Sequence, residues 1–490
     1  MKKIVLPLAF MALVVLLSLG VSGSTPKGAQ ALTAKPNIVF ILADDMRYDD
    51  LKYMPQTLSV LKAKGMSFEN AFVSHALCCP ARATIMRGQY AHNTNVWSNS
   101  STTSGGWQAY KANGNEADNV ATRLNDAGYR TGLFGKYLNG YEAGTTIIPP
   151  GWDRWFATPS SQDYFNYDAN DQGTIRHYGT SDSDYKTDVI SREANTFISD
   201  SASSGNPFFA YVVPKAPHLP ATPAPRDVHT YDGVKAPRLP SFNEADVSDK
   251  PSWIQQMKRL GARKQAQIDT RHENRVETLQ ALDDLVAGVV NTLNNANAMG
   301  NTYIFFTSDN GWHEGEHRIP GEKWRPYEED IHMPLLVRGP NPQVGSVPEV
   351  RAASTTYKLT LNTDYLPTLM DLAGAQSPPY VDGRSLKPVL KENATTWRNA
   401  ILLEAAAHSS PAYYGIRTVA SSTTTKGKYV EYEGTERELY DLKADPYELT
   451  NTYNATPPSA DLVSRMQALK SCRANAVPPE VTCQVAEDGP

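Results

Sequence analysis

The sequence predicts an α/β protein whose central sheet is mostly parallel and is sandwiched by helices. Short, continuously apolar segments rich in β-branched and aromatic residues recur along the chain, and helical periods separate them. Such segments are typical of strands buried on both faces, as in parallel sheets. With 490 residues, 40% hydrophobic and 20% charged content, the chain can also bury a large core.

The predicted elements follow this alternation along the chain. The expected strands are residues 37–43, 131–134, 208–213, 303–307 and 333–337. The expected helices are residues 51–64, 119–127, 188–198 and 274–298. Residues 144–185, rich in Gly, Asp, Ser and Tyr, and the proline-rich residues 214–251 are predicted to be loops over the sheet. In such a fold the ligand lies beyond the carboxyl ends of the strands.

The chain is expected to have three parts. Residues 1–31 resemble an export signal, because two lysines precede an apolar run and Ala29-Gln30-Ala31 resembles a cleavage site. An uncleaved membrane anchor is the alternative. Residues 35–395 should form a catalytic domain and residues 396–490 a smaller α+β subdomain. We therefore expect a secreted, periplasmic or extracellular protein without stable membrane association after cleavage, because later apolar runs are too short to span a bilayer.

The net charge bears on the binding partner, and the positions of the four cysteines indicate which of them are paired. The formal net charge is −5, and loss of the signal, which carries three lysines and no acids, makes it −8. This balance disfavours nucleic acid as a partner. In an exported protein Cys472 and Cys483 are expected to form a disulfide. The adjacent Cys78 and Cys79 then have no partner elsewhere.

Oxygen ligands follow two of the predicted strands. Asp44 and Asp45 come after residues 37–43, and Asp309 and Asn310 come after residues 303–307. Each pair alone is more simply a helix cap or a turn. Together at one edge of a sheet, three carboxylates and an amide favour a hard cation, Ca²⁺ or Mg²⁺.

Cys78 directly precedes a predicted helix that begins with Pro80. The free N–H groups of that turn favour an anion, so a thiol there is expected to have a lowered pKa and to be reactive. Arg82 lies one turn away. Three interpretations compete at this stage: a structural cysteine pair, a thiolate nucleophile and a metal ligand. Zinc is not supported by any companion Cys/His spacing.

Residues 78–88, CCPARATIMRG, resemble the signature of the sulfatase family, whose first Cys in C-x-P-x-R is converted to formylglycine (3-oxoalanine). Only Cys78 has Pro80 and Arg82 at the required offsets. Similarity extends to the C-terminal segment 438–449. Residues 76–80 and 89–93 most resemble N-acetylglucosamine-6-sulfatases and related bacterial arylsulfatases.

The resemblance implies an alkaline-phosphatase-like fold, a formylglycine-generating enzyme as partner, and roles for individual residues. Ligands of one divalent cation, generally calcium, are expected to be Asp44, Asp45, Asp309, Asn310 and the modified Cys78. The resemblance makes Arg82 the residue that fixes the formylglycine hydrate, Lys136 and Lys323 the sulfate ligands, and His218 a catalytic histidine.

Leu138 stands where many sulfatases have a histidine, and Asn139 is expected to replace it. Loops that carry His92, His313 and His317 are expected to contact the substrate.

The expected activity is therefore hydrolysis of an aryl or carbohydrate O-sulfate, with a sulfated small molecule or glycan as substrate. A phosphomonoester or phosphonate hydrolase of the same superfold is the alternative, since phosphoryl and sulfuryl groups need similar clamps. Two metals would favour phosphate, whereas the sequence offers ligands for one. An inactive protein that binds sulfated glycans is a second alternative.

Overall fold

The computed structural model describes Met1 and residues 35–489, except 101–102, 341–348, 409, 420–426 and 477–480. Apart from Met1, the segment expected to be an export signal lies outside the described residues. The unit Lys35–Pro490 is compact. Within the part of the chain that is described, no helix is long and apolar enough to cross a membrane.

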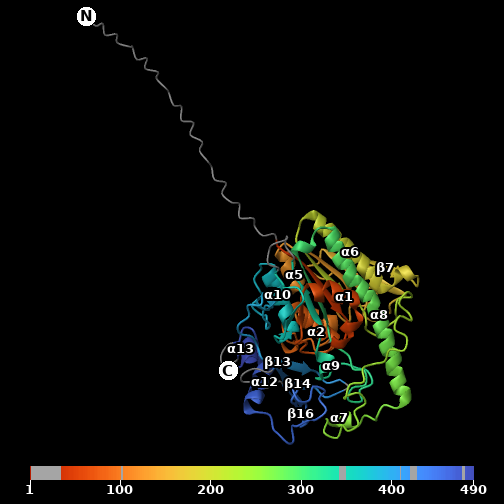
Figure 1. The fold of residues 1–490 in the computed structure, drawn as a ribbon, viewed down its shortest axis with the longest axis vertical. Coiled ribbons are helices and arrows are strands. Elements are labelled where there is room, and N and C mark those ends of the chain that lie inside the picture. Colours follow the sequence, from red (N-terminus) through yellow and green to blue (C-terminus); the bar gives the residue numbers. More distant parts are fainter. Residues whose placement is uncertain are drawn as a thin grey trace. The chain divides into compact units, whose positions relative to one another are not determined.

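A ten-stranded sheet forms the centre of the unit (Figure 1). Its strand order is β11-β2-β10-β9-β1-β8-β4-β5-β6-β7. The bounds are β1 (Asn37–Ala43), β2 (Met66–Phe68), β4 (Arg130–Lys136), β5 (Arg154–Thr158), β6 (Tyr167–Asp171), β7 (Thr174–Tyr178), β8 (Phe208–Val213), β9 (Thr302–Ser308), β10 (Leu335–Arg338) and β11 (Ser354–Thr356). The run β9-β1-β8-β4-β5 is parallel, whereas β10, β6 and β7 pair antiparallel with their neighbours. The mostly parallel sheet is confirmed.

One loop prediction is wrong. Residues 144–185 contain β5, β6 and β7, which extend the sheet at one edge. Tyr167 and Ala169 are buried in the core while Asp168 between them is only half-buried, which is the period of a strand. The glycines lie between the strands, whereas Asp168 and Asp171 lie within β6, so the polar composition of the segment hides its strand period. Residues 214–251 have no helix or strand, as predicted.

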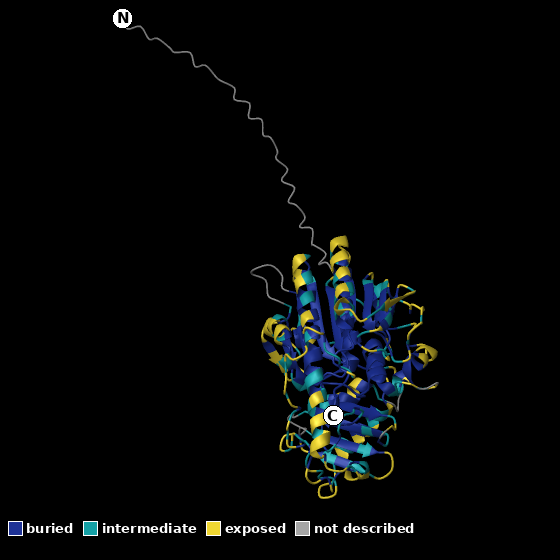
Figure 2. Cartoon of the chain, turned by 90° about the vertical axis from the view of Figure 1, so that its right-hand side faces the viewer, coloured by how far each residue is buried: buried dark blue, intermediate teal, exposed yellow. Residues whose placement is uncertain are grey.

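Helices cover both faces of the sheet. Their bounds are α1 (Pro55–Val60), α2 (Cys78–Arg87), α3 (Ala91–Thr94), α4 (Gly106–Ala112), α5 (Val120–Asp126), α6 (Lys186–Ser204), α7 (Ser252–Gln255), α8 (Ala262–Asn295), α9 (Glu328–Ile331), α10 (Tyr365–Leu372), α11 (Lys387–Leu390), α12 (Ala460–Ser471) and α13 (Cys483–Asp488). Alternate residues of β1 enter two separate cores: Phe40 packs with residues of α2, α5 and α10, and Ile41 packs with residues of α6 and α8. Figure 2 shows this buried interior beneath helices with exposed outer sides.

A second sheet follows in the C-terminal part. It is antiparallel and has the order β13 (Ala400–Ala405), β14 (Tyr413–Thr418), β15 (Lys428–Tyr432) and β16 (Arg437–Tyr440). α12 and α13 pack on it, and the predicted disulfide joins Cys472 to Cys483 between them. A separate two-stranded sheet pairs β3 (Ala71–Phe72) with β12 (Thr360–Leu361). Its residues Phe72 and Leu361 belong to the same hydrophobic cluster as the second sheet. The predicted C-terminal α+β character is confirmed.

Candidate active site

Four neighbouring strands of the large sheet end at the same edge. Ala43, the last residue of β1, lies in register with Ser308, the last residue of β9. β8 and β4 continue the row, and β4 ends with Lys136. Parallel strands therefore bring residues that are far apart in the sequence to one edge.

The expected metal ligands meet there and are fully buried. The backbone N–H of Asp45 donates to Asp309 at 3.1 Å, and the Asn310 side-chain amide donates to Asp45 at 2.6 Å. Asp44, Asp45, Cys78 and His218 each offer one ligand atom, and these atoms lie within 4.8 Å of one another. The structure brings the whole expected set together.

Cys78 begins α2 and points into this cluster. Its sulfur lies 3.5 Å from Asp44 Oδ1 and 3.8 Å from Asp45 Oδ1. Lys323 Nζ donates to the same sulfur at 2.8 Å. Cys79 instead packs in the hydrophobic core beside α2. The two adjacent cysteines thus face different environments, and only Cys78 faces the cluster.

The expectation of a lowered pKa at Cys78 is wrong. Burial, together with Asp44 and Asp45, raises the pKa of its thiol to about 12 and outweighs the nearby lysines. An unmodified Cys78 is therefore a protonated thiol at neutral pH. This argues against the thiolate nucleophile that the position at a helix start had suggested.

Three cations balance the buried carboxylates. Lys136 Nζ lies 2.6 Å from Asp44 Oδ2, and Arg82 Nε lies 2.7 Å from Asp309 Oδ2. Lys323 Nζ contacts Asp45 directly. Burial would raise the pKa of Asp44, but the charges of the surrounding cations hold it well below its usual value. Asp44 therefore remains a carboxylate, which a cation requires as a ligand.

His218 follows β8 and lies at the rim of the cluster. Its Nε2 is 3.6 Å from Asp45 Oδ2, and its Nδ1 is 2.6 Å from the carbonyl oxygen of Leu219. Burial lowers the pKa of His218 to about 4 despite the neighbouring carboxylates. The imidazole is therefore neutral at pH 7. With Nδ1–H donating to the carbonyl, Nε2 has a lone pair and can accept a proton.

The donor set fits a hard divalent cation. Asp45 Oδ2 and Asn310 Oδ1 are buried oxygens that have no hydrogen-bond partner among the described residues, which is costly in a protein interior. Both belong to the cluster that also holds Asp44 and Asp309. Carboxylate and amide oxygens are the ligands that Ca²⁺ and Mg²⁺ prefer. A cation coordinated here would satisfy both atoms.

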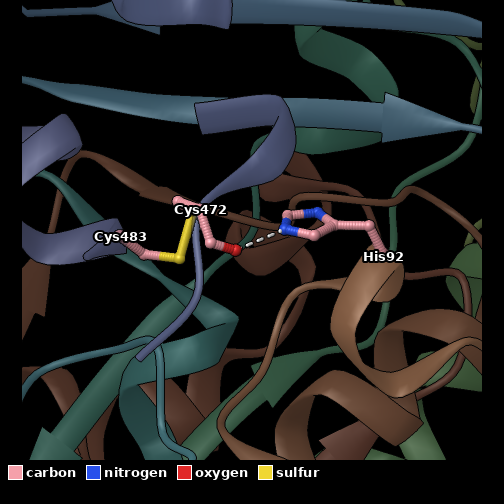
Figure 3. Close-up of side chains that lie close together, drawn as sticks. All are labelled: His92, Cys472 and Cys483. Carbon is pink, nitrogen blue, oxygen red and sulfur yellow. Dashed lines mark hydrogen bonds between the residues drawn. A yellow bond between two sulfur atoms is a disulfide. The ribbon is translucent and has the colours of Figure 1, made fainter. Parts of the chain in front are cut away.

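Three of the residues expected to contact substrate instead bind other parts of the protein. Figure 3 shows His92 Nε2 facing the carbonyl oxygen of Cys472, at 3.0 Å, and its Nδ1 lies 2.8 Å from Glu404. His313 Nδ1 lies 2.7 Å from Asp330, and His317 Nδ1 lies 2.7 Å from Glu244. His313 and His317 are also fully buried. These contacts do not support a direct substrate role, and the geometry favours structural ones.

Asn139 is placed better for such a role. It lies three residues beyond Lys136 and is half-buried, and its Oδ1 has no hydrogen-bond partner in the part of the chain that the structure describes. That Asn139 takes the place of the histidine that many sulfatases have at the position of Leu138 stays a prediction.

Several neighbours of the site were not predicted. Arg275 of α8 donates to the carbonyl oxygen of Asp45 at 2.8 Å. Lys215, just after β8, is buried and donates to the carbonyl oxygens of Ser160 and Gln162. Arg275 shares the buried side of α8 with other polar residues such as His272, so its type did not single it out. The available signal for Lys215 was its position just after the predicted strand 208–213.

Comparison with protein families decides the identity. The sulfatase family model matches residues 36–375, and the model described as N-sulphoglucosamine sulphohydrolase, C-terminal, matches residues 315–474. The chain belongs to the sulfatase family. It is a sulfuric ester hydrolase, and the expectation drawn from the Cys78 motif is confirmed at the level of family and reaction class.

Named relatives agree. An N-acetylglucosamine-6-sulfatase from Capra hircus is 33% identical, over 93% of this chain and 86% of the relative. An arylsulfatase from Volvox carteri is 30% identical, over 90% of this chain and 76% of the relative. A Drosophila melanogaster protein named as an extracellular sulfatase homologue is 34% identical, over 77% of this chain and 34% of the relative.

Solved structures share the fold. One, described as a complex with its substrate D-glucosamine-2-N,6-O-disulfate, has a TM-score of 0.74 and 24% identity, covering 89% of this chain and 97% of that one. A phosphonate monoester hydrolase from Silicibacter pomeroyi has a TM-score of 0.65 and 20% identity, covering 89% and 94%. At these identities both structures show the fold alone. The family model and the named relatives are what favour a sulfatase over the phosphonate alternative. Sulfatases generally use a formylglycine and a divalent metal, and the buried acidic cluster of this sulfatase is the matching feature.

Proposed function

We propose that this sulfatase hydrolyses a sugar O-sulfate with a formylglycine made from Cys78 by a formylglycine-generating enzyme. The observation that carries the proposal is the convergence of Cys78, Lys136 and Lys323 on one buried carboxylate cluster. Cys78 alone of the two adjacent cysteines faces that cluster. The sugar is supported by relatives named N-acetylglucosamine-6-sulfatase.

In this proposal the cation is held by Asp44, Asp45, Asp309 and Asn310, together with the modified Cys78. Ca²⁺ is proposed, since the four side chains offer only oxygen donors, and Mg²⁺ is the alternative. When bound, the ion would withdraw charge from the nucleophilic oxygen and from the sulfuryl group. Arg82 donates hydrogen bonds to Asp309 and to the carbonyl oxygen of Lys136. It therefore positions the ends of β9 and β4, which carry a metal ligand and a sulfate ligand.

The formylglycine hydrate supplies the oxygen that receives the sulfuryl group and later releases sulfate by returning to the aldehyde. Lys136 and Lys323 are the groups that bind the sulfate oxygens, where negative charge develops. Lys323 stays an ammonium, because the carboxylates outweigh burial and raise its pKa, so it holds a proton beside the leaving alcohol. A bound cation would offset the charge of those carboxylates and make the ammonium a stronger acid, as proton transfer to the alcohol requires. His218, neutral and with a free Nε2 lone pair, is suited to accept the proton of the second hydroxyl.

Activity assays test this proposal. Purified protein should release sulfate from N-acetylglucosamine 6-sulfate within a panel of sulfated monosaccharides, aryl sulfates and phosphonate esters. The Cys78→Ala variant should be inactive on all of them. Preference for phosphonate esters, or full activity in Cys78→Ala, would overturn the proposal.

We also propose export and a two-part catalytic unit. The apolar run near the N-terminus and the Cys472–Cys483 disulfide fit an oxidising compartment, and so does the extracellular relative. The proposed boundary at residue 396 precedes β13, where the second sheet begins.

A further inference from the structure

Trp324 is held in an unusual backbone conformation next to the site. Its φ is +88°, in a region that bulky residues rarely occupy and that is strained for a side chain of this size. Its neighbour Lys323 contacts Cys78, and its own backbone N–H donates to the carbonyl oxygen of Ala76 at 3.1 Å. The chain is therefore fixed at Lys323 and at the backbone N–H of Trp324, close to the start of α2.

The Trp324 ring stacks on a histidine of the C-terminal part. Its centroid lies 4.0 Å from that of His408, and the two planes differ by 13°. His408 lies in the connection between β13 and β14 and is exposed, while Trp324 is half-buried. Trp324 belongs to none of the hydrophobic clusters found among the described residues. Core packing therefore does not account for its place.

We propose that Trp324, backed by His408, is a platform on which the sugar ring of the substrate packs. This inference rests on the proposed function and deepens it. Lys323 fixes where the sulfate lies, so the alcohol part of the ester must occupy space beside it. A flat indole suits the apolar C–H face of a pyranose, and aromatic side chains commonly line such pockets. The C-terminal part thus takes part in choosing the alcohol.

Equilibrium binding to the inactive Cys78→Ala protein tests the platform without turnover. Calorimetry would compare N-acetylglucosamine 6-sulfate with inorganic sulfate, which occupies only the sulfate pocket. The sugar sulfate should bind more tightly than sulfate, and adding Trp324→Ala should raise its Kd by about tenfold. The Kd for inorganic sulfate should change less than twofold. His408→Ala should act in the same direction but less strongly, and Trp324→Phe should recover part of the loss.

Three outcomes would overturn the inference. The sugar sulfate could bind no more tightly than sulfate in the parent protein, or its Kd could be unchanged in Trp324→Ala. Equal losses for both ligands would show that Trp324 merely positions Lys323. Unfolding midpoints of all variants would identify those that are misfolded, and His408→Ala then serves as the second variant. A wrong proposed function would give a different result: the unmutated enzyme would not hydrolyse the sugar sulfate.

Discussion

Lys323 Nζ lies 2.8 Å from Cys78 Sγ, although 245 residues separate them in the sequence. The lysine also contacts Asp45, so one ammonium joins the start of α2 to the end of β1. The ammonium does not turn the Cys78 thiol into a thiolate nucleophile, because burial and the carboxylates keep the thiol protonated. The arrangement is better suited to an oxygen nucleophile and a sulfate group, which both accept hydrogen bonds from an ammonium.

The first prediction concerns the identity of the nucleophile precursor. In active enzyme, a tryptic peptide that contains Cys78 should be lighter than its cysteine form, because sulfur is replaced by a carbonyl oxygen. Cys78→Ser should be inactive in a host that modifies only cysteine. Mass spectrometry and sulfate release measure the two results.

Cys79→Ala is the matched control, because Cys79 packs in the core and does not face the cluster. It should keep the modification and at least a tenth of the activity, with only a small loss of stability from the removed sulfur. Active enzyme in which the Cys78 peptide still carries a thiol would contradict the prediction.

The second prediction concerns the two sulfate lysines. Lys136→Met and Lys323→Met should each lower kcat/KM by about 10²–10³-fold, because each removes a donor where charge develops in the transition state. Lys264→Met, at an exposed position on α8, should leave kcat/KM unchanged. Steady-state kinetics on an aryl sulfate measure all three. An effect of Lys323→Met below tenfold would remove that residue from the proposed mechanism.

The carboxylate cluster at the edge of the sheet could be predicted, because its aspartates directly follow apolar strands in the sequence. Asp44 directly follows the apolar run of β1, and Asp309 directly follows β9. Once the strands are parallel and adjacent, their carboxyl ends must meet. The cluster was therefore foreseeable without knowledge of any side-chain contact.

The three histidines could not be placed in this way. His92, His313 and His317 lie near motif residues in the sequence, but their ring nitrogens bind carboxylates from distant elements, Glu404, Asp330 and Glu244. Local sequence says nothing about such partners. The Trp324–His408 stack was missed for the same reason, since its two rings come from different parts of the fold.

The third prediction concerns the cation. Ca²⁺ at a hundredfold excess over its Kd should raise the free energy of unfolding by about 2.7 kcal/mol, because it binds only the folded cluster. EDTA should reverse the effect. Asp309→Asn should abolish most of the calcium-dependent shift in Tm, whereas Asp269→Asn, in a partly exposed ion pair on α8, should retain it. Equal calcium shifts in both variants would refute the assigned site.

The last prediction concerns His92, which joins α3 to the second sheet. Burial disfavours its charge, but Glu404, at 2.8 Å, outweighs this and raises the pKa of His92 to about 9 from an ordinary 6.5. The folded protein therefore keeps a proton that the unfolded chain releases. The resulting stability is complete below pH 6.5, at about 3 kcal/mol, and is lost as pH rises towards 9.

Chemical denaturation of the unmutated protein and His92→Gln at several pH values measures this contribution. The stability difference should be largest at pH 6 and should shrink steadily to pH 9, because only the unmutated protein loses a proton-linked contact. His229→Gln is the matched control, since His229 forms an ion pair with Asp232 at 2.8 Å but is exposed to solvent. Its stability should parallel the unmutated protein throughout. A His92→Gln difference that stays constant with pH would mean that the ring is held neutral and that the contact with Glu404 is an uncharged hydrogen bond.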